Sequence, residues 1–218
     1  MVKGQPDVVL FPVTTEEVSK IMKVATREKI PVTKEDVRLL YEYDRWANDR
    51  ILKLVGALTP EQFTRDLGGS FPSVRDVLLH IVASKWAWLT YWKESSPSDR
   101  ILTDLFTRSA TLFQSESVPT LATVQAKWTE VEREHVEFVN EVSDELLDRT
   151  LPVGNTSVSL AHLMQHLSNH STYHRGQIAM MLRQLGAKAQ GTDFAEFLLT
   201  AADSYSHRAA QHSAAHRL

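Results

Sequence analysis

Four long stretches of the sequence repeat apolar residues at helical spacing, and this pattern restricts the chain to a mainly helical core. They cover about residues 34–58, 73–92, 119–142 and 159–185. Each stretch has one apolar side and one polar side, as expected of a helix that packs against its neighbours along a single face. We therefore predict an all-α fold, a four-helix bundle.

The connections between these stretches carry turn and helix-end signals. Thr33 followed by Asp36 predicts a cap at the start of the first helix, and Gly186 predicts the end of the last one. Residues 99–118 mix apolar residues with Ser and Thr, so we expect a connector with one short helix. Residues 151–158 contain proline and glycine and favour a turn or a small hairpin.

The two ends of the chain differ from the bundle sequence. Residues 1–33 show a strand–helix–strand pattern, which predicts a short β-α-β-like N-terminal appendage. Residues 201–218 have no apolar stripe, and we expect a polar, disordered tail. The predicted organisation is therefore an appendage at 1–33, a bundle at 34–200 and a tail at 201–218.

The appendage also resembles a piece of a larger domain. Residues 4–33, with Pro6–Val18 and Ile30–Thr33 as the similar segments, resemble the start of an FAD-linked oxidase domain. In that family a glycine-rich loop that holds the flavin diphosphate follows directly. Here Lys34, Glu35 and Asp36 follow instead, so the fragment is truncated and FAD is not expected.

Composition narrows the chemistry that this chain can carry. It has no cysteine and nine histidines, so disulfides, thiolate metal sites and a cysteine nucleophile are excluded. The net charge of −3 gives no general attraction to nucleic acid or to an anionic membrane, and neither is an expected partner. Because no signal-peptide or membrane-spanning pattern is found either, we expect a cytoplasmic protein.

The last helical stretch places four histidines at intervals of four, at His162, His166, His170 and His174. This is the spacing at which two imidazoles on one helix can share a metal ion. A helical wheel places His170 and His174 on the apolar side, His166 at its boundary and His162 toward solvent. The inward pair is either a pair of metal ligands or a pair of hydrogen-bonded packing residues.

A catalytic metal site of the zinc type needs a third protein ligand. Within the predicted bundle only two further histidines are available, His80 and His135. His80 falls at the edge of the apolar side of residues 73–92, whereas His135 lies on the apolar side of residues 119–142. Helical periodicity leaves both residues open as the third ligand.

The segment His170–Ile178 resembles the signature of the DinB family, also called YfiT-like. Three further segments agree with that family in the same order: Tyr43–Asn48, Ser73–Ile81 and Gly191–Phe194. The resemblance implies a bundle that is often a homodimer. It also implies a divalent metal, nickel or zinc, held by His80, His170 and His174.

The family includes transferases and isomerases that use a low-molecular-weight thiol. By this resemblance, we expect a metal-dependent transferase or hydrolase that activates an external thiol or water for reaction with a small molecule. Since the chain has no cysteine, any thiol must arrive as a cosubstrate. The alternative is a non-enzymatic metal-binding protein of the stress response.

Some neighbouring residues are candidates for supporting roles, and no catalytic residue is assigned. Tyr43, Asp44 and Gln177 are candidates for orienting the imidazoles, or they are ordinary surface and core residues. Arg175 either holds an anionic substrate or forms a salt bridge within the bundle. We expect Trp86, Trp88 and Trp92 to be packing residues.

Overall fold

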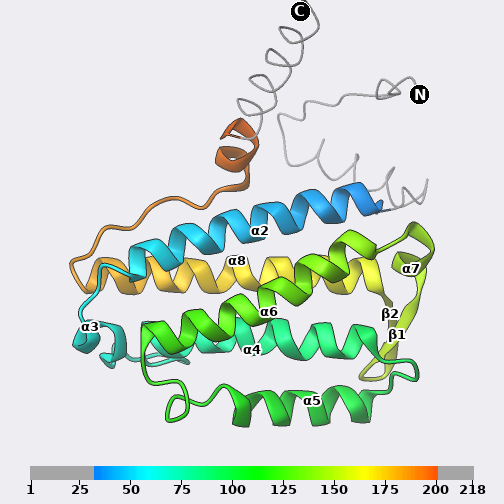
Figure 1. Cartoon of the computed structure of the whole chain (residues 1–218), viewed down its shortest axis with the longest axis horizontal. Coiled ribbons are helices and arrows are strands. Elements are labelled where there is room, and N and C mark those ends of the chain that lie inside the picture. The colour runs from blue at the N-terminus through cyan, green and yellow to red at the C-terminus, as the bar shows by residue number, and fades with distance from the viewer. Residues whose placement is uncertain (1–31, 201–218) are drawn as a thin grey trace, which may run out of the picture. The chain divides into compact units, whose positions relative to one another are not determined.

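The computed structural model describes residues 32–200, and its central feature is a bundle of four long helices (Figure 1). In the bundle α8 packs against both α2 and α4, and α4 also packs against α6. Helices α2 and α6 are also neighbours. The long helices are α2 (Lys34–Val55), α4 (Val74–Lys93), α6 (Leu121–Glu141) and α8 (Leu160–Gln184).

The ends of these helices confirm the signals seen in the sequence. The Thr33 hydroxyl accepts a bond from the Asp36 N–H while the Asp36 carboxylate accepts one from the Thr33 N–H, which closes a capping box on α2. Ser73 caps α4 in a similar way, through the Asp76 N–H. After α8 the chain turns at Gly186, whose φ of 72° is readily adopted by glycine.

The prediction for residues 99–118 underestimated the helix there. Helix α5 (Asp99–Leu112) has 14 residues and packs along α4. Its threonines bond to the helix itself, as when the Thr103 hydroxyl donates to the Asp99 carbonyl oxygen. Burial of Leu102 and Leu105 against α4 outweighs the low helix propensity of Ser and Thr, which sequence alone does not reveal.

Short elements connect the long helices. Strands β1 (Thr150–Val153) and β2 (Thr156–Ser159) form an antiparallel hairpin, as predicted, with Gly154 at a φ of 57° in its turn. Two other short elements lie between the long helices, α3 (Pro60–Thr64) and α7 (Asp144–Asp148). Residues 194–200, after α8, are also helical. The all-α fold is thereby confirmed, with this hairpin as the only sheet among residues 32–200.

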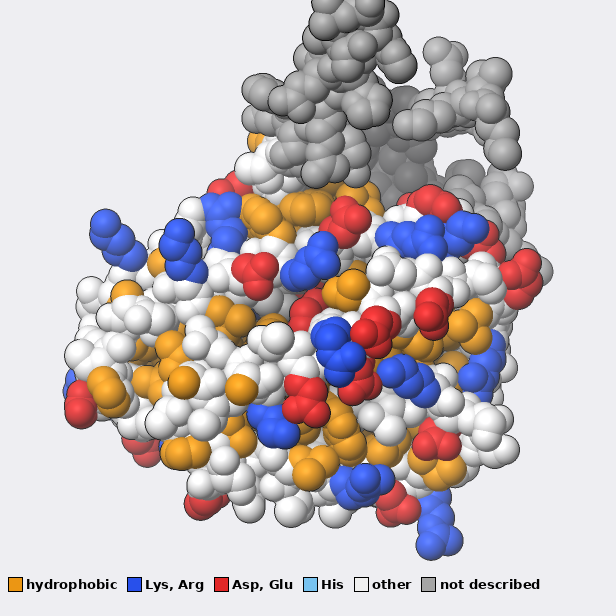
Figure 2. Space-filling view, viewed as in Figure 1, with side chains coloured by type: hydrophobic (Ala, Val, Ile, Leu, Met, Phe, Trp, Pro, Cys, Tyr) orange, Lys and Arg blue, Asp and Glu red, His pale blue; other side chains and the backbone are white. Residues whose placement is uncertain are grey.

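The main apolar core lies between α2, α4, α6 and α8. Among the described helices, none is long and apolar enough to span a membrane. On the face that carries α2 and α6, acidic and basic side chains are intermixed (Figure 2). Residues 1–31 and 201–218 lie outside the described residues, and so do the predicted appendage, apart from its last two residues, and the predicted tail.

Candidate metal centre

The structure brings together His80 of α4 with His170 and His174 of α8. Their potential ligand atoms all lie within 4.8 Å of one another. The Nε2 atom of His170 is 3.0 Å from that of His80 and 3.1 Å from that of His174. Residues 90 positions apart in sequence therefore present the same ring atom to a single point.

These distances fit three nitrogens around one ion. Two nitrogens bound at about 2.0–2.1 Å from one zinc ion lie about 2.8–3.4 Å apart, for angles between a right angle and the tetrahedral angle. Both measured separations fall in this range. The donor set is therefore suited to a divalent metal with nitrogen affinity.

Gln177 fixes the orientation of one ring. Its Oε1 atom lies 2.7 Å from Nδ1 of His174, so Nδ1 carries the proton and donates it to the amide oxygen. The lone pair of His174 then resides on Nε2, the atom that faces the other two histidines. This contact selects Gln177 from the three residues proposed to orient the imidazoles.

Burial keeps the three imidazoles neutral, which is the form that binds metal. Loss of hydration, together with the nearby His174 ring, lowers the pKa of His80 to about 4. Burial also lowers the pKa of His170 to about 3, with the neighbouring histidines adding to the effect. For His174, burial lowers the pKa, while the bond to Gln177 partly opposes the shift.

A buried ion network lies beside the histidines. Arg175 follows His174 in α8, and its guanidinium donates to Asp44 Oδ1 at 2.5 Å and to Asn48 Oδ1 at 2.9 Å. Lys85 of α4 reaches the other Asp44 oxygen at 2.9 Å. Burial raises the pKa of the Asp44 carboxyl, but Lys85 and Arg175 outweigh it and hold that pKa below its usual value.

This network decides between the two interpretations of Arg175. Its side chain is only 1% exposed and is bound to Asp44, so it forms a salt bridge within the bundle and has no free face for an anion. Tyr43, another candidate for orienting the rings, instead donates its hydroxyl to the Thr192 carbonyl oxygen. Asp44 bonds to Asn48, Lys85 and Arg175, and no bond from it to a histidine is found among the described residues.

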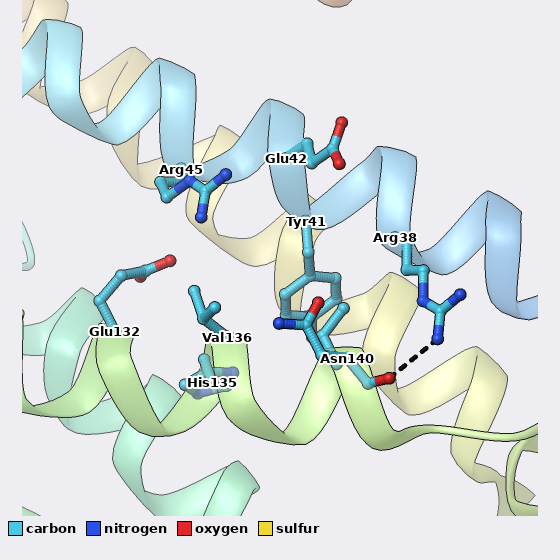
Figure 3. A pocket seen from close by; sticks show the side chains of 9 residues that line it. Arg38, Tyr41, Glu42, Arg45, Glu132, His135, Val136 and Asn140 are labelled. Carbon is cyan, nitrogen blue, oxygen red and sulfur yellow. Dashed lines mark hydrogen bonds between the residues drawn. The ribbon is translucent and has the colours of Figure 1, made fainter.

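His135, the other candidate for the third ligand, lies outside this cluster. It is fully buried on α6, and its Nε2 donates to the Lys85 carbonyl oxygen at 2.9 Å. Its ring stacks on Tyr41 beside a cavity of about 240 Å³ between α2 and α6 (Figure 3). Burial lowers the pKa of His135 to about 3, so this residue is a neutral, hydrogen-bonded core histidine.

The remaining histidines of α8 have the positions that the helical wheel predicts or nearly so. His162 is exposed and hydrogen-bonded to the cap residue Ser159. His166, expected at the boundary, is also exposed, and its ring meets Trp88 at 5.7 Å. Neither belongs to the group that could hold a metal among residues 32–200.

A comparison with protein families matches residues 27–209 to the model of the DinB family. The chain belongs to the DinB family. The matched region contains the whole bundle and all three clustered histidines. Membership therefore confirms the resemblance carried by the four sequence segments.

Three individual proteins are similar to this chain in sequence or in structure. Protein DinB of Bacillus subtilis (strain 168) is 28% identical over 164 residues, which cover 73% of this chain and 91% of that protein. A crystal structure of an uncharacterised protein from Escherichia coli UTI89 covers 74% of this chain and 99% of its own, with a TM-score of 0.53 and 14% identity. A DinB-like protein from Bacillus cereus ATCC 10987 matches with a TM-score of 0.45, at 18% identity and 73% and 97% coverage. The Escherichia coli structure shares the fold of this bundle.

Two residues of this region were not found by sequence reasoning. Lys85 is buried at the centre of the ion network, and Phe71 stacks on His80 with ring centroids 4.3 Å apart. Lys85 could have been found as the only charged residue in the mainly apolar run from Ile81 to Leu89. Phe71 precedes its helix in a glycine-containing loop, and nothing in its spacing indicates contact with a histidine.

Proposed function

We propose that the chain is a metal-dependent enzyme whose His80, His170 and His174 hold a divalent ion, zinc or nickel. In this role the centre activates an external thiol or water for reaction with a small molecule. The observation that carries the proposal is the convergence of the three Nε2 atoms at 3.0–3.1 Å around His170. Gln177 and burial support it, because they keep the rings oriented and neutral.

The number of ligands favours a reactive site over a structural one. Among residues 32–200 the group contains three histidines and no carboxylate. Structural zinc sites use four protein ligands, whereas catalytic sites use three and leave a position for water or substrate. A centre with three imidazoles also keeps the full positive charge of the ion.

A divalent ion in such a site supplies Lewis acidity, which lowers the pKa of bound water or thiol toward neutrality. Gln177 holds the ring of His174, and burial keeps the imidazoles of His80 and His170 unprotonated. In thiol transfer, the thiol loses its proton and its sulfur bonds to an electrophilic carbon. The leaving group departs with the bonding electron pair and takes up a proton from water. In hydrolysis, water takes the place of the thiol.

Metal content of the purified full chain tests the proposal. We expect about one zinc or nickel ion per chain, and loss of most of it in His80→Ala, His170→Ala and His174→Ala. His162→Ala and His166→Ala are matched controls on the same row of α8 and should keep the metal. Full metal content in all three ligand variants, with helical content unchanged by circular dichroism, would overturn the site.

Activity is the second arm of this test. The loaded protein is incubated with small thiols and an aromatic electrophile, and in parallel with an ester. Turnover that is lost when a chelator is added, and that is absent from His174→Ala, supports a metal-dependent enzyme activity. Stable metal binding without turnover on such a panel favours the non-enzymatic alternative. The homodimer and the cytoplasmic location remain predictions.

A further inference from the structure

His80, one of the three histidines of the candidate metal centre, also lines a pocket. A cavity of about 360 Å³ lies between α4 and α5, and His80 is part of its lining. Ala83 lines it from α4, one helical turn after His80, and Ala110 lines it from α5. Its volume is at the lower end of the range for small-ligand pockets.

Aromatic rings form and support the walls of this pocket. Phe71 stacks on His80 with an interplanar angle of 29° and meets the ring of His174 edge-on at 5.5 Å. Phe106 packs edge-on against Trp88, with ring centroids 5.7 Å apart. These contacts hold an apolar surface directly beside the clustered histidines.

The polar groups of the lining are largely occupied by bonds within the protein. Both carboxylate oxygens of Asp76 accept bonds, Oδ2 from Ser73 and Oδ1 from Arg75 and Ser115. The Ser109 hydroxyl donates to the Phe106 carbonyl oxygen. The lining contains the carboxylates of Asp76 and Glu116 and no lysine or arginine. A negatively charged ligand group would therefore lose its hydration in this pocket without gaining a cationic side chain as partner.

The cavity between α2 and α6 offers a contrast. Its lining includes Arg38, Glu42, Arg45 and Glu132, and it contains none of the three clustered histidines (Figure 3). A reacting group bound there would be surrounded by both acidic and basic side chains, and none of the three clustered histidines would line its site. Of these two cavities, the one between α4 and α5 has the more apolar lining, and it includes one of the clustered histidines, His80.

We propose that the pocket between α4 and α5 binds the uncharged, apolar part of the substrate, a group of about one or two rings. The substrate atom that reacts lies at the end of the pocket that His80 lines. This assignment rests on the proposed function for its catalytic meaning, because it places the electrophile beside the centre that activates the thiol or water. The substrate class is then a small aromatic or aliphatic compound without charge on the buried part.

Fluorine NMR of para-fluorotoluene tests the pocket with the full chain loaded with zinc or with paramagnetic cobalt(II). We expect the probe line to broaden with protein, and to be several-fold broader with cobalt than with zinc. Ala83→Phe and Ala110→Phe fill the pocket from opposite walls and should restore the narrow line while metal content is unchanged. Ala126→Phe, at an exposed position of α6, is the matched control and should behave as the parent protein.

The charged analogue para-fluorobenzenesulfonate, an anion at neutral pH, tests the substrate class with the metal-free chain. It should bind at least about tenfold more weakly than para-fluorotoluene. Equal or tighter binding of the sulfonate would overturn the assignment of an uncharged ligand. The pocket itself is refuted if cobalt is bound without extra broadening, or if neither filling variant changes the line.

The two proposals can fail separately. If the chain binds no metal, the proposed function fails, while broadening by the metal-free chain that Ala83→Phe and Ala110→Phe abolish still supports the pocket. If the metal is bound and the filled variants retain the probe, the metal centre stands and the pocket does not.

Discussion

At the scale of single residues, the centre depends on which ring nitrogen carries the proton. Gln177 accepts the Nδ1 proton of His174 and so leaves Nε2 free. The inward direction of His170 and His174 was predictable, because helical periodicity fixes which side of a helix a residue faces. The choice of His80 over His135 was not available from periodicity, since both lie on or near apolar sides. It came from the family resemblance, and the structure shows the reason in the separate surroundings of His135.

Replacing Gln177 tests the role of this contact. Gln177→Leu removes the acceptor and should weaken metal affinity about 10- to 100-fold, because the His174 tautomer is no longer fixed. Competition with a chromophoric chelator measures the affinity. Gln177→Glu keeps an oxygen acceptor at the same place and should retain it. If the leucine and glutamate variants bind metal equally, the amide oxygen does not act through His174.

At the scale of helices, a buried charge network sets how α2, α4, α6 and α8 meet. Asp44 of α2 pairs with Arg175 of α8 and with Lys85 of α4, and Lys85 also pairs with Glu132 of α6 at 2.8 Å. Sequence reasoning identified Asp44 and Arg175 as candidates but not their pairing. Pairing across a bundle depends on the depth and rotation of each helix, and the apolar pattern fixes these only approximately.

Asp44→Asn removes the carboxylate that pairs with the buried Arg175 and leaves Lys85 with Glu132 alone. We expect a loss of about 3–5 kcal/mol in the free energy of unfolding. Urea unfolding of chelator-treated protein measures this loss without a contribution from bound metal. Glu134→Gln breaks the exposed pair with Lys93, whose side chains are 42–43% exposed, and should cost less than about 1 kcal/mol. Similar costs for both variants would mean that the buried network does not stabilise the bundle.

At the scale of the whole molecule, the bundle brings three histidines from two helices together beside a pocket that His80 also lines. The four long helices were predictable from periodicity and caps, because both signals are local. The length of helix α5 was underestimated, because packing on α4 stabilises this helix more than the helix propensity of its residues does. The pocket was also out of reach of the sequence, since its lining joins a loop, two helices and the segment after α5.

The central claim is that three histidine Nε2 atoms bind one divalent metal. The most direct measurement is an anomalous-scattering map from crystals of the metal-loaded full chain, collected at the absorption edge of the bound metal. We predict one peak per chain about 2.0–2.2 Å from Nε2 of His80, His170 and His174. A metal peak at another site, or one that touches fewer than three of these atoms, would contradict the account.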